Sequence, residues 1–283
     1  MNSKVYIITA KTNLHVGSGD SDFGMIGKQI QRDPLDNLPC INASSLKGAL
    51  REYVEEALAN KSAANLIFGN GMNKLDNISE EDKEKGDASN VQNAKGNHIF
   101  HESFLLSIPV RSNHERYFNA TSPKVLKDFL ENMELFDIKL NDDLTNAIKA
   151  LSALSPTKGK PIIFLNQSNI KLEDFTAVFD ATQVEIVKQL IGQRIALLED
   201  SDFNELTSDY QLPLIARNNL ENGQSKNLWY EQIIPRQSRF YATITDMGGG
   251  NQLEGLIDEK HIQIGANATI GYGLCHFKSL ETA

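Results

Sequence analysis

The sequence has few of the residues that mark several common protein classes. Cys40 and Cys275 are the only two cysteines among 283 residues, too few for a disulfide framework or a cysteine-rich structural zinc site. No apolar run approaches the ~18 residues that a bilayer-spanning helix needs. The first residues, MNSKVYII, lack the long apolar region and the cleavage site of a signal peptide and predict a strand. We therefore expect a cytoplasmic protein with no membrane partner.

Positive charge is also in short supply. The chain has 28 Lys and Arg against 37 Asp and Glu, a net charge of −9, which disfavours a non-specific nucleic-acid binder. The charge is uneven, however: residues 171–209 hold nine acidic and three basic residues, whereas residues 1–51 hold six basic and four acidic residues. Because salt screens charges beyond about 8–10 Å, the local balance decides what a surface attracts. The global acidity therefore does not exclude an RNA partner.

Hydrophobic content of 40% and charged content of 23% are ordinary for a globular protein of this length, which can bury a large core. Mixed strands and helices without strict βαβ alternation predict the α+β class. The pattern predicts strands at residues 4–12, 99–110, 239–245 and 261–264. It predicts helices from residues 42–45 onward (apolar stripe Leu46, Leu50, Tyr53, Val54, Ala57, Leu58), at 122–134 with Ser122 as the cap and Pro123 first, at 142–153 and at 182–192.

One segment has almost no large apolar side chains. Residues 69–98 are polar and rich in lysine and glutamate. Such a composition cannot bury enough apolar surface to order itself, so we predict a mobile surface insertion there.

The N-terminal part combines a glycine loop with a basic helix start. Residues 14–24 read LHVGSGDSDFG, and residues 44–51 read SSLKGALR. A helix N-terminus offers unpaired N–H groups, and Lys47 and Arg51 lie one turn apart on one face. This arrangement suits a phosphate-bearing ligand; the alternative interpretation is a capped surface helix with solvated cations.

A second glycine loop closes the chain. Residues 265–273 read GANATIGYG, which has neither the order of a dinucleotide-binding G-x-G-x-x-G nor the Gly-Lys-Ser/Thr of a P-loop. An approach of the backbone to RNA phosphates fits the loop better, with a plain hairpin turn as the alternative. Upstream, residues 217–239 interleave basic residues with the only Trp, a pattern that suits stacking on splayed bases but also an ordinary core.

Three ordered blocks together resemble the RAMP superfamily of CRISPR effector proteins, and most closely the Cmr4 family of type III-B backbone subunits. The second block favours this family over its type III-A, Csm3-like counterpart, which shares the first block. The blocks are HVGSG at 15–19 with IQR at 30–32 and SSLKGALR at 44–51, then PVRS at 109–112 with TSP at 121–123, then GANATIGYG at 265–273.

The resemblance implies a fold, a set of partners and a chemistry. Residues 1–283 would form a single RAMP domain with a ferredoxin-like (RRM-type) core, insertions and a projecting β-hairpin thumb, which we place at about residues 215–234. Copies would stack along a CRISPR RNA (crRNA) with other type III-B effector subunits, and each thumb would kink the target RNA at regular intervals. No cofactor would be bound permanently, but a divalent metal, Mg or Mn, would be needed for cleavage of the target RNA. The sequence shows no metal-ligand cluster of its own.

The residue on which that chemistry depends differs here. The family reads roughly Gly-hydrophobic-hydrophobic-Asp-x-Pro-Ile-Gln-Arg, so its catalytic aspartate maps onto Gly27 and its proline onto Gln29. In the family, the ribose 2′-hydroxyl would attack the adjacent phosphate in line, with a carboxylate to hold a metal or take a proton. Glycine can do neither, so we predict a chain that binds guide and target without cutting.

Gly27 has two possible origins. The protein is a natural non-cleaving variant, or the glycine is a substitution that traps target RNA. The family-like flanking residues favour the second origin. Asp20 or Asp22 would have to reach across several residues to replace the missing carboxylate.

The candidate site follows from these segments. Gly27, Glu231 and His15 are the candidate catalytic positions; Glu231 is expected near the cut phosphate, and His15 would contact RNA or assist proton transfer unless its role is structural. The candidate RNA-binding residues are Gly17, Ser18, Gly19, Gln31, Arg32, Ser44, Ser45, Lys47, Arg51, Arg111, Trp229, Tyr230, Gly265, Asn267, Thr269, Gly271, Tyr272 and Gly273.

Two alternative functions stay open at the level of sequence. The chain could be another RAMP subunit or a crRNA-processing endonuclease that acts alone on one stem-loop. A nucleotide-binding enzyme that uses the glycine loop for phosphate is the alternative from a different class, and it would require an enclosed pocket.

Overall fold

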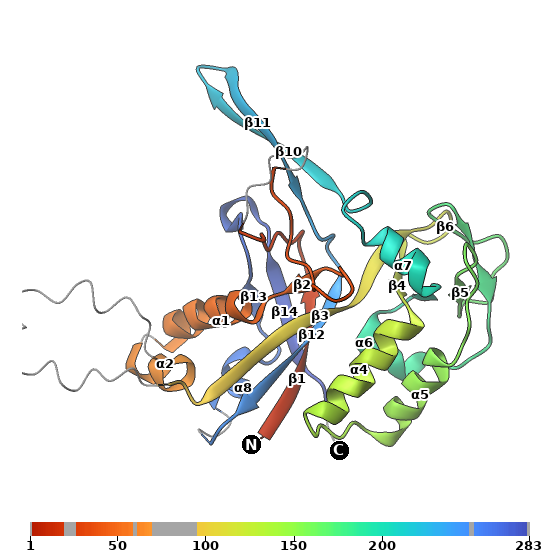
Figure 1. Ribbon diagram of the computed structural model, residues 1–283, viewed down its shortest axis with the longest axis horizontal. Coiled ribbons are helices and arrows are strands. Elements are labelled where there is room, and N and C mark those ends of the chain that lie inside the picture. The colour runs from red at the N-terminus through yellow and green to blue at the C-terminus, as the bar shows by residue number, and fades with distance from the viewer. Residues whose placement is uncertain (1, 20–26, 59–60, 70–94, 249–251, 282–283) are drawn as a thin grey trace, which may run out of the picture.

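The computed structural model describes residues 2–19, 27–58, 61–69, 95–248 and 252–281. Asp20, Asp22 and most of the predicted insertion at 69–98 lie outside the described residues. Within them, the expected α+β architecture is present as one large mixed sheet with helices packed on it (Figure 1).

The centre of the sheet has the ferredoxin-like strand order. β1 (Asn2–Ala10) lies between β14 (Leu274–Ser279) and β12 (Arg239–Asp246), and β12 also pairs with β3 (His98–Arg111), all antiparallel. The chain runs β1, α1 (Ala43–Leu58), β3, β12, α8 (Gln252–Ile257), β14, so the spatial order 4-1-3-2 is that of a split βαβ fold. Residues 5–10 of β1 are all buried, as a central strand covered on both faces requires.

The long strand β3 joins this centre to the rest of the sheet. Its first ten residues pair with β12, and its last four pair with β4 (Tyr117–Thr121). The sheet then continues through β9 (Ile195–Leu197) and β5 (Ile162–Ile163) to β8 (Val178–Phe179); β13 (His261–Gln263) forms the opposite edge, and β2 (Cys40–Ile41) pairs with β3 off this path. A separate short pair is formed by β6 (Lys171–Leu172) and β7 (Phe175–Thr176).

Two groups of helices cover the sheet. α1 packs against α2 (Lys61–Phe68), α8 and β3, with Leu46, Leu50 and Val54 buried as its apolar period predicts, although Ala57 is exposed. On the other side of the molecule, α4 (Pro123–Leu135) packs against α5 (Asp142–Ser152) and β3 (Figure 1). Ser122 caps α4 by accepting a hydrogen bond from the Val125 N–H, as expected.

The helix predicted at 182–192 is wrong in its first residues. The structure has only η3 (Glu185–Val187) and α6 (Lys188–Ile191), because Asp180 accepts a hydrogen bond from the Thr182 N–H and holds a turn there. Gly192, at a φ of 129°, ends the helix. The remaining helical segments are α7 (Asp200–Leu206) and η4 (Ala268–Ile270).

A two-stranded hairpin projects from the body (Figure 1). It consists of β10 (Leu214–Glu221) and β11 (Gln224–Gln232), which cover the predicted thumb region. Its tip is Asn222-Gly223, with φ of 53° and 78°, the combination that a two-residue type I′ turn needs. Ile233 and Ile234, which follow β11, are buried in the body, so the hairpin has a fixed base and an exposed tip.

Candidate nucleic-acid interface at the base of the hairpin

Three segments that are far apart in the sequence meet at the hairpin base. The first glycine loop pairs with residues 29–31, since Ser18 N–H donates to the Gln29 carbonyl and Gln31 N–H donates to the Val16 carbonyl. Lys28 continues onto β11, where its N–H donates to the Tyr230 carbonyl and its carbonyl accepts from the Gln232 N–H. The stretch at 27–31 therefore connects the glycine loop to the hairpin.

The terminal glycine loop packs onto the same place. Ala266 N–H donates to the His15 carbonyl at 2.9 Å. Gly265 has a φ of 78°, and a Cβ there would lie 2.4 Å from the His15 oxygen, so only glycine fits this close approach. Gly273 meets the same limit, because a Cβ on it would lie 2.1 Å from the Ile264 oxygen. The terminal loop therefore needs glycine at both positions in order to pack against the backbone of His15 and Ile264.

Glu231 is the centre of a polar network in which all three segments take part. Its side chain is 1% exposed and accepts hydrogen bonds from Trp229 Nε1 at 2.9 Å and from Asn267 Nδ2 at 2.8 Å. Lys28 Nζ lies 3.4 Å from one carboxylate oxygen and Arg217 Nε lies 4.0 Å from the other. We call these five residues the thumb-base network.

The network decides the charge state of Glu231. Burial alone would raise the pKa of this carboxyl group, but the hydrogen bonds from Trp229 and Asn267, then the charge of Arg217 and a hydrogen bond from Lys28, hold the pKa below its ordinary value. Glu231 is therefore a buried, ionised anchor with both oxygens engaged.

Gly27 lies directly beside this network. A Cβ on Gly27 would lie 3.4 Å from the Trp229 Cβ and 3.7 Å from the Tyr230 oxygen, which are ordinary contact distances. The backbone at this position does not have the positive φ that restricts other glycines here. A Cβ atom therefore fits at position 27, so crowding at this atom does not explain the glycine.

The residues that the structure describes at the hairpin base do not fit a divalent metal. Gly27 offers no side-chain ligand, and Glu231 has both oxygens committed to protein donors. Among the residues that the structure describes, no group of three or more His, Cys, Asp and Glu side chains is placed to hold a metal ion.

Several candidate residues in the first block serve the architecture of the site. His15 is 3% exposed, and its Nδ1 donates to the Gln232 carbonyl at 2.7 Å. Gln31 donates to the Gly17 carbonyl and to Ser45 Oγ, and its Oε1 accepts from the Asn42 N–H, so it joins the glycine loop to the start of α1. Arg32 donates to Asp209 at 2.8 Å and to the carbonyls of the turns around it.

The two basic residues of α1 have different surroundings. Arg51 donates to Asn65 and to the Gly69 carbonyl and pairs with Glu55, so it ties α1 to the end of α2. Among the described residues, the one contact of the Lys47 ammonium group is distant, with Nζ 6.0 Å from the centroid of the Phe100 ring. Lys47 is thus the more available of the two for a phosphate.

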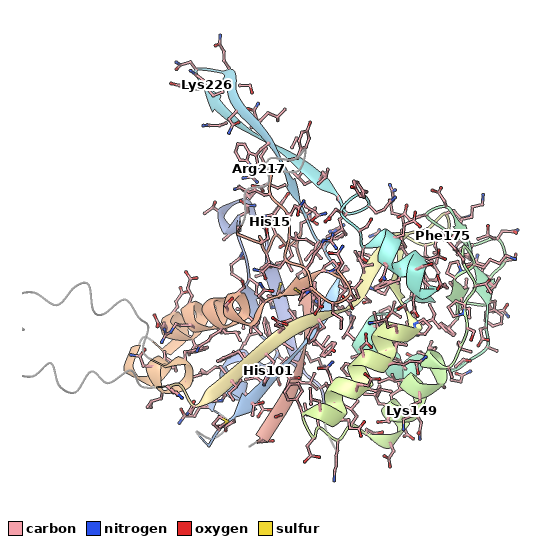
Figure 2. All side chains as sticks on the ribbon, in the orientation of Figure 1. His15, His101, Lys149, Phe175, Arg217 and Lys226 are labelled. Carbon is pink, nitrogen blue, oxygen red and sulfur yellow. The ribbon has the colours of Figure 1, made fainter. Side chains whose placement is uncertain are left out.

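The remaining candidates line the periphery of the base. Trp229 is half-buried beneath Lys28, whose Nζ lies 5.8 Å from the indole centroid, and Tyr230 is partly exposed on the hairpin. Figure 2 shows His15 under the hairpin and Arg217 on its lower part, with Lys226 near the tip. The exposed or half-exposed loop positions are Gly17, Ser18, Gly19, Ser44, Thr269, Gly271 and Tyr272.

Arg111 lies apart from the thumb-base network. It is bound by Glu173, with Arg111 Nη2 2.9 Å from a carboxylate oxygen. It lines a cleft of about 1100 Å³ that extends to Pro213, Pro235 and Arg236 at the foot of the hairpin.

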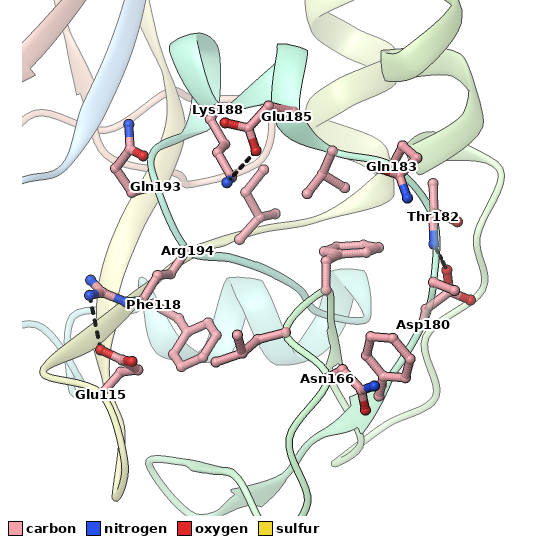
Figure 3. A pocket seen from close by; sticks show the side chains of 16 residues that line it. Glu115, Phe118, Asn166, Asp180, Thr182, Gln183, Glu185, Lys188, Gln193 and Arg194 are labelled. Atoms are coloured by element: carbon pink, nitrogen blue, oxygen red, sulfur yellow. Dashed lines mark hydrogen bonds and ion pairs between the residues drawn. The ribbon is translucent and has the colours of Figure 1, made fainter.

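A further pocket of about 370 Å³ is located in the other half of the molecule (Figure 3). Its floor includes Phe118. Arg194 is held by Glu115 and Lys188 by Glu185, so its two basic groups are already neutralised (Figure 3).

Sequence reasoning did not single out Lys28, Arg217 or Gln232. Lys28 and Gln232 have roles that depend on contacts between residues about two hundred positions apart, such as the bond from Ile30 N–H to Gln232 Oε1, whereas Arg217 meets Glu231 across the hairpin. The one local signal was the run of basic and aromatic residues in β10 and β11.

Comparison with known proteins agrees with this architecture. The sequence model of the RAMP superfamily matches residues 7–276. The chain is 29% identical to a protein of Pyrococcus furiosus named CRISPR system Cmr endoribonuclease Cmr4, over 93% of this chain and 90% of that protein. It is 24% identical to the CRISPR system CMR subunit Cmr4 of Saccharolobus solfataricus, over 98% of this chain and 96% of that protein.

Solved structures share the fold. A chain of the type III-B Cmr-beta complex bound to cognate target RNA superposes with a TM-score of 0.76 at 21% identity, covering 99% of this chain and 98% of that one. Oligomeric Cmr4 from Pyrococcus furiosus superposes with a TM-score of 0.70 at 22% identity, covering 100% of this chain and 99% of that one. None of the helices among the described residues is long and apolar enough to cross a bilayer.

Proposed function

The chain belongs to the RAMP superfamily, and we propose that it is a backbone subunit of a type III-B CRISPR RNA-guided complex in the cytoplasm. Its partners are a crRNA, a target RNA, further copies of itself and other subunits of the complex. Homology to Cmr4 proteins over nearly the whole length supports this assignment. In this proposal, residues 1–283 form a single RAMP domain, with an insertion at 69–98 and the thumb at about 215–234.

The thumb-base network is the observation that carries the proposal. It fixes the hairpin, the first glycine loop and the terminal glycine loop to one another through Glu231. Exposed residues of the two loops, such as Ser18, Gly19 and Thr269, and the half-buried indole of Trp229 thus lie around the root of the projecting hairpin. Backbone amides suit phosphates, and aromatic rings suit unstacked bases, so RNA would pass the root with a kink imposed by the hairpin.

The charges at the root favour holding RNA. Within the thumb-base network, Lys28 and Arg217 face the single carboxylate of Glu231, which gives a net positive charge. Lys28 is more than half exposed, so a phosphate can approach its ammonium group.

The same geometry supports the loss of target cleavage. In-line attack by a 2′-hydroxyl requires a group that takes its proton or a cation that stabilises the phosphate. Gly27 lies where the family places its aspartate, and the nearby Glu231 is buried and bonded on both oxygens. We therefore propose that the endoribonuclease activity of the family is absent from this chain, so that Mg or Mn would bring no cleavage.

Native mass spectrometry of the purified chain with a synthetic guide RNA tests the assignment. We expect several copies on one RNA, with the number of copies rising in proportion to RNA length. A single copy per RNA at every length would indicate a processing enzyme, and no complex at all would refute the proposal.

A further inference from the structure

A cleft of about 280 Å³ lies away from the thumb-base network, between α4 and the turn at residues 33–39. Its floor is apolar, and its rim is mostly acidic. The lining residues are Asp33, Leu35, Asp36, Leu38, Pro39, Cys40, Phe104, Leu105, Lys124, Val125, Asp128, Glu131, Asn132 and Tyr241.

Tyr241 is an unusual member of the floor. It is 3% exposed, with its ring packed edge-on against Phe129 and tilted against Phe104. Its hydroxyl forms no hydrogen bond with any residue that the structure describes, yet the oxygen is not among the fully enclosed atoms. Burial, and then the carboxylates of Asp128, Asp36 and Asp33, raise the pKa of this phenol, so the group stays neutral. Since Tyr241 lines the cleft and its hydroxyl is not enclosed, a group that enters the cleft can hydrogen-bond with it.

The rim carries four carboxylates and one ammonium group. Lys124 pairs with Asp128 at 2.6 Å and with Asp36 at 3.5 Å, which leaves the rim with an excess of negative charge. Asp33 and Asp36 are held in place because each accepts a hydrogen bond from a backbone N–H of the turn. Glu131 is exposed and has no partner among the described residues. Such a rim repels phosphate and attracts a cation.

The turn also presents an apolar side chain beside the cleft. Leu35 is 89% exposed at its tip, although the turn that carries it is fixed by the two aspartates. Together with the apolar floor of the cleft, Leu35 extends the apolar surface at this place.

We propose that this cleft receives a lysine or arginine side chain, flanked by an apolar residue, from another subunit of the complex. The stem of the side chain would lie on the apolar floor, its cationic end would meet the rim, and the Tyr241 hydroxyl would accept one of its hydrogen bonds. The excess negative charge of the rim complements a basic segment, and we assign that segment to a different protein of the complex. The inference rests on the proposed function, which supplies such subunits.

Two substitutions in the reconstituted complex test the cleft. Tyr241→Phe removes only the unpartnered hydroxyl, and Glu131→Lys reverses a rim charge on the surface of α4. Their matched controls are Tyr210→Phe, at a tyrosine that is 94% exposed, and Glu134→Lys, one helical turn along α4 and outside the cleft. Because each cleft variant weakens a contact to a charged group, we expect about a tenfold loss of affinity for one other subunit in native mass spectrometry. The controls should assemble like the wild type.

A crosslinking experiment identifies the occupant. Cys40 and Cys275 are buried, and burial above all raises the pKa of each thiol to about 12, so a new Glu131→Cys thiol reacts selectively with a benzophenone maleimide. Crosslinks to a basic segment of a different subunit would support the proposal. Crosslinks only to another copy of this chain or to RNA would overturn it, as would full assembly of both cleft variants.

Binding of guide RNA by the isolated chain separates the two proposals. If the wild type binds guide RNA and the cleft variants assemble normally, only the cleft inference fails. If the wild type does not bind guide RNA, the proposed function itself fails.

Discussion

Asn267 Nδ2 donates a hydrogen bond of 2.8 Å to Glu231 Oε2 and thereby joins the terminal glycine loop to the root of the hairpin. The two residues are 36 positions apart in the sequence. Each side chain supplies a hydrogen-bond partner to the other. Glu231 would otherwise be a buried charge with fewer partners, and Asn267, at a left-handed φ of 68°, would hold its loop less firmly.

We expect Glu231→Gln to destabilise the fold. A glutamine still accepts from Trp229, but it loses the charge that Lys28 and Arg217 face, and its amide opposes that of Asn267. Breaking a buried, bonded charge in this way costs about 2–4 kcal/mol of the free energy of unfolding. Urea denaturation measures the change, with Glu221→Gln, an exposed pair to Lys226 on the same hairpin, as the control. Equal stability of the two variants would contradict the role of the network.

The stability that Glu231 supplies should depend on pH. Its pKa in the folded protein lies below the ordinary value, so the unfolded chain binds a proton more readily than the folded one. The contribution is therefore complete above the unfolded pKa of about 4.3 and is lost as the pH falls through the folded pKa. The difference in unfolding free energy between wild type and Glu231→Gln should shrink in acid. A difference that is constant from pH 7 down to acid would mean that ionisation plays no part.

Two of the three positive-φ glycines of the terminal loop, Gly265 and Gly271, should respond differently to alanine. Gly265 and Gly271 have φ of 78° and 81°, so alanine at either costs about 1–2 kcal/mol of backbone strain. At Gly271 the new Cβ meets nothing within 4 Å, whereas at Gly265 it meets the His15 oxygen at 2.4 Å. We predict that Gly265→Ala lowers the melting temperature clearly more than Gly271→Ala. Equal losses would show that the loop does not pack on His15 as described.

Substitutions of Lys47 and Arg51 should have different effects, the first on RNA binding and the second on thermal stability. Lys47→Ala removes a cation that forms no ion pair with the described part of the chain, so we expect weaker RNA binding and a salt dependence reduced by about one phosphate contact. Arg51→Ala removes the clamp between α1 and α2 and should lower thermal stability. Fluorescence anisotropy with labelled RNA at several salt concentrations, together with thermal melts, tests both. The interpretation is wrong if Lys47→Ala leaves RNA binding unchanged.

Local pattern was sufficient for much of the fold. The apolar period of Leu46, Leu50 and Val54 and the cap at Ser122 each predicted a helix that the structure contains. The segment at 182–192 has apolar residues at similar spacing, but the turn at Asp180 and the φ of Gly192 limit its helix to less than the predicted length. The residues that form the turn and end the helix were visible in the sequence, and their effect outweighed the helical spacing of the apolar residues.

The candidate site was less accessible to sequence reasoning. Arg32 reads locally as a free cation, but its partner Asp209 is 177 residues away, and Gln31 is similarly engaged by α1. Long-range partners of this kind leave no local signal, so a sequence cannot distinguish an RNA-facing cation from one held inside the protein. The glycines of the terminal loop, by contrast, were recognisable, although the structure explains Gly265 and Gly273 by packing.

The most direct measurement is target-RNA cleavage by the assembled complex, with Gly27 or with Gly27→Asp, in Mg²⁺ or Mn²⁺. Contact distances at position 27 leave room for a Cβ, and Gly27→Asn adds nearly the same bulk as aspartate without the charge. We predict intact target RNA with the wild type and with Gly27→Asn, and fragments at regular intervals with Gly27→Asp. Regular cleavage by the wild type, or none by Gly27→Asp in a complex that binds target RNA, would contradict the account.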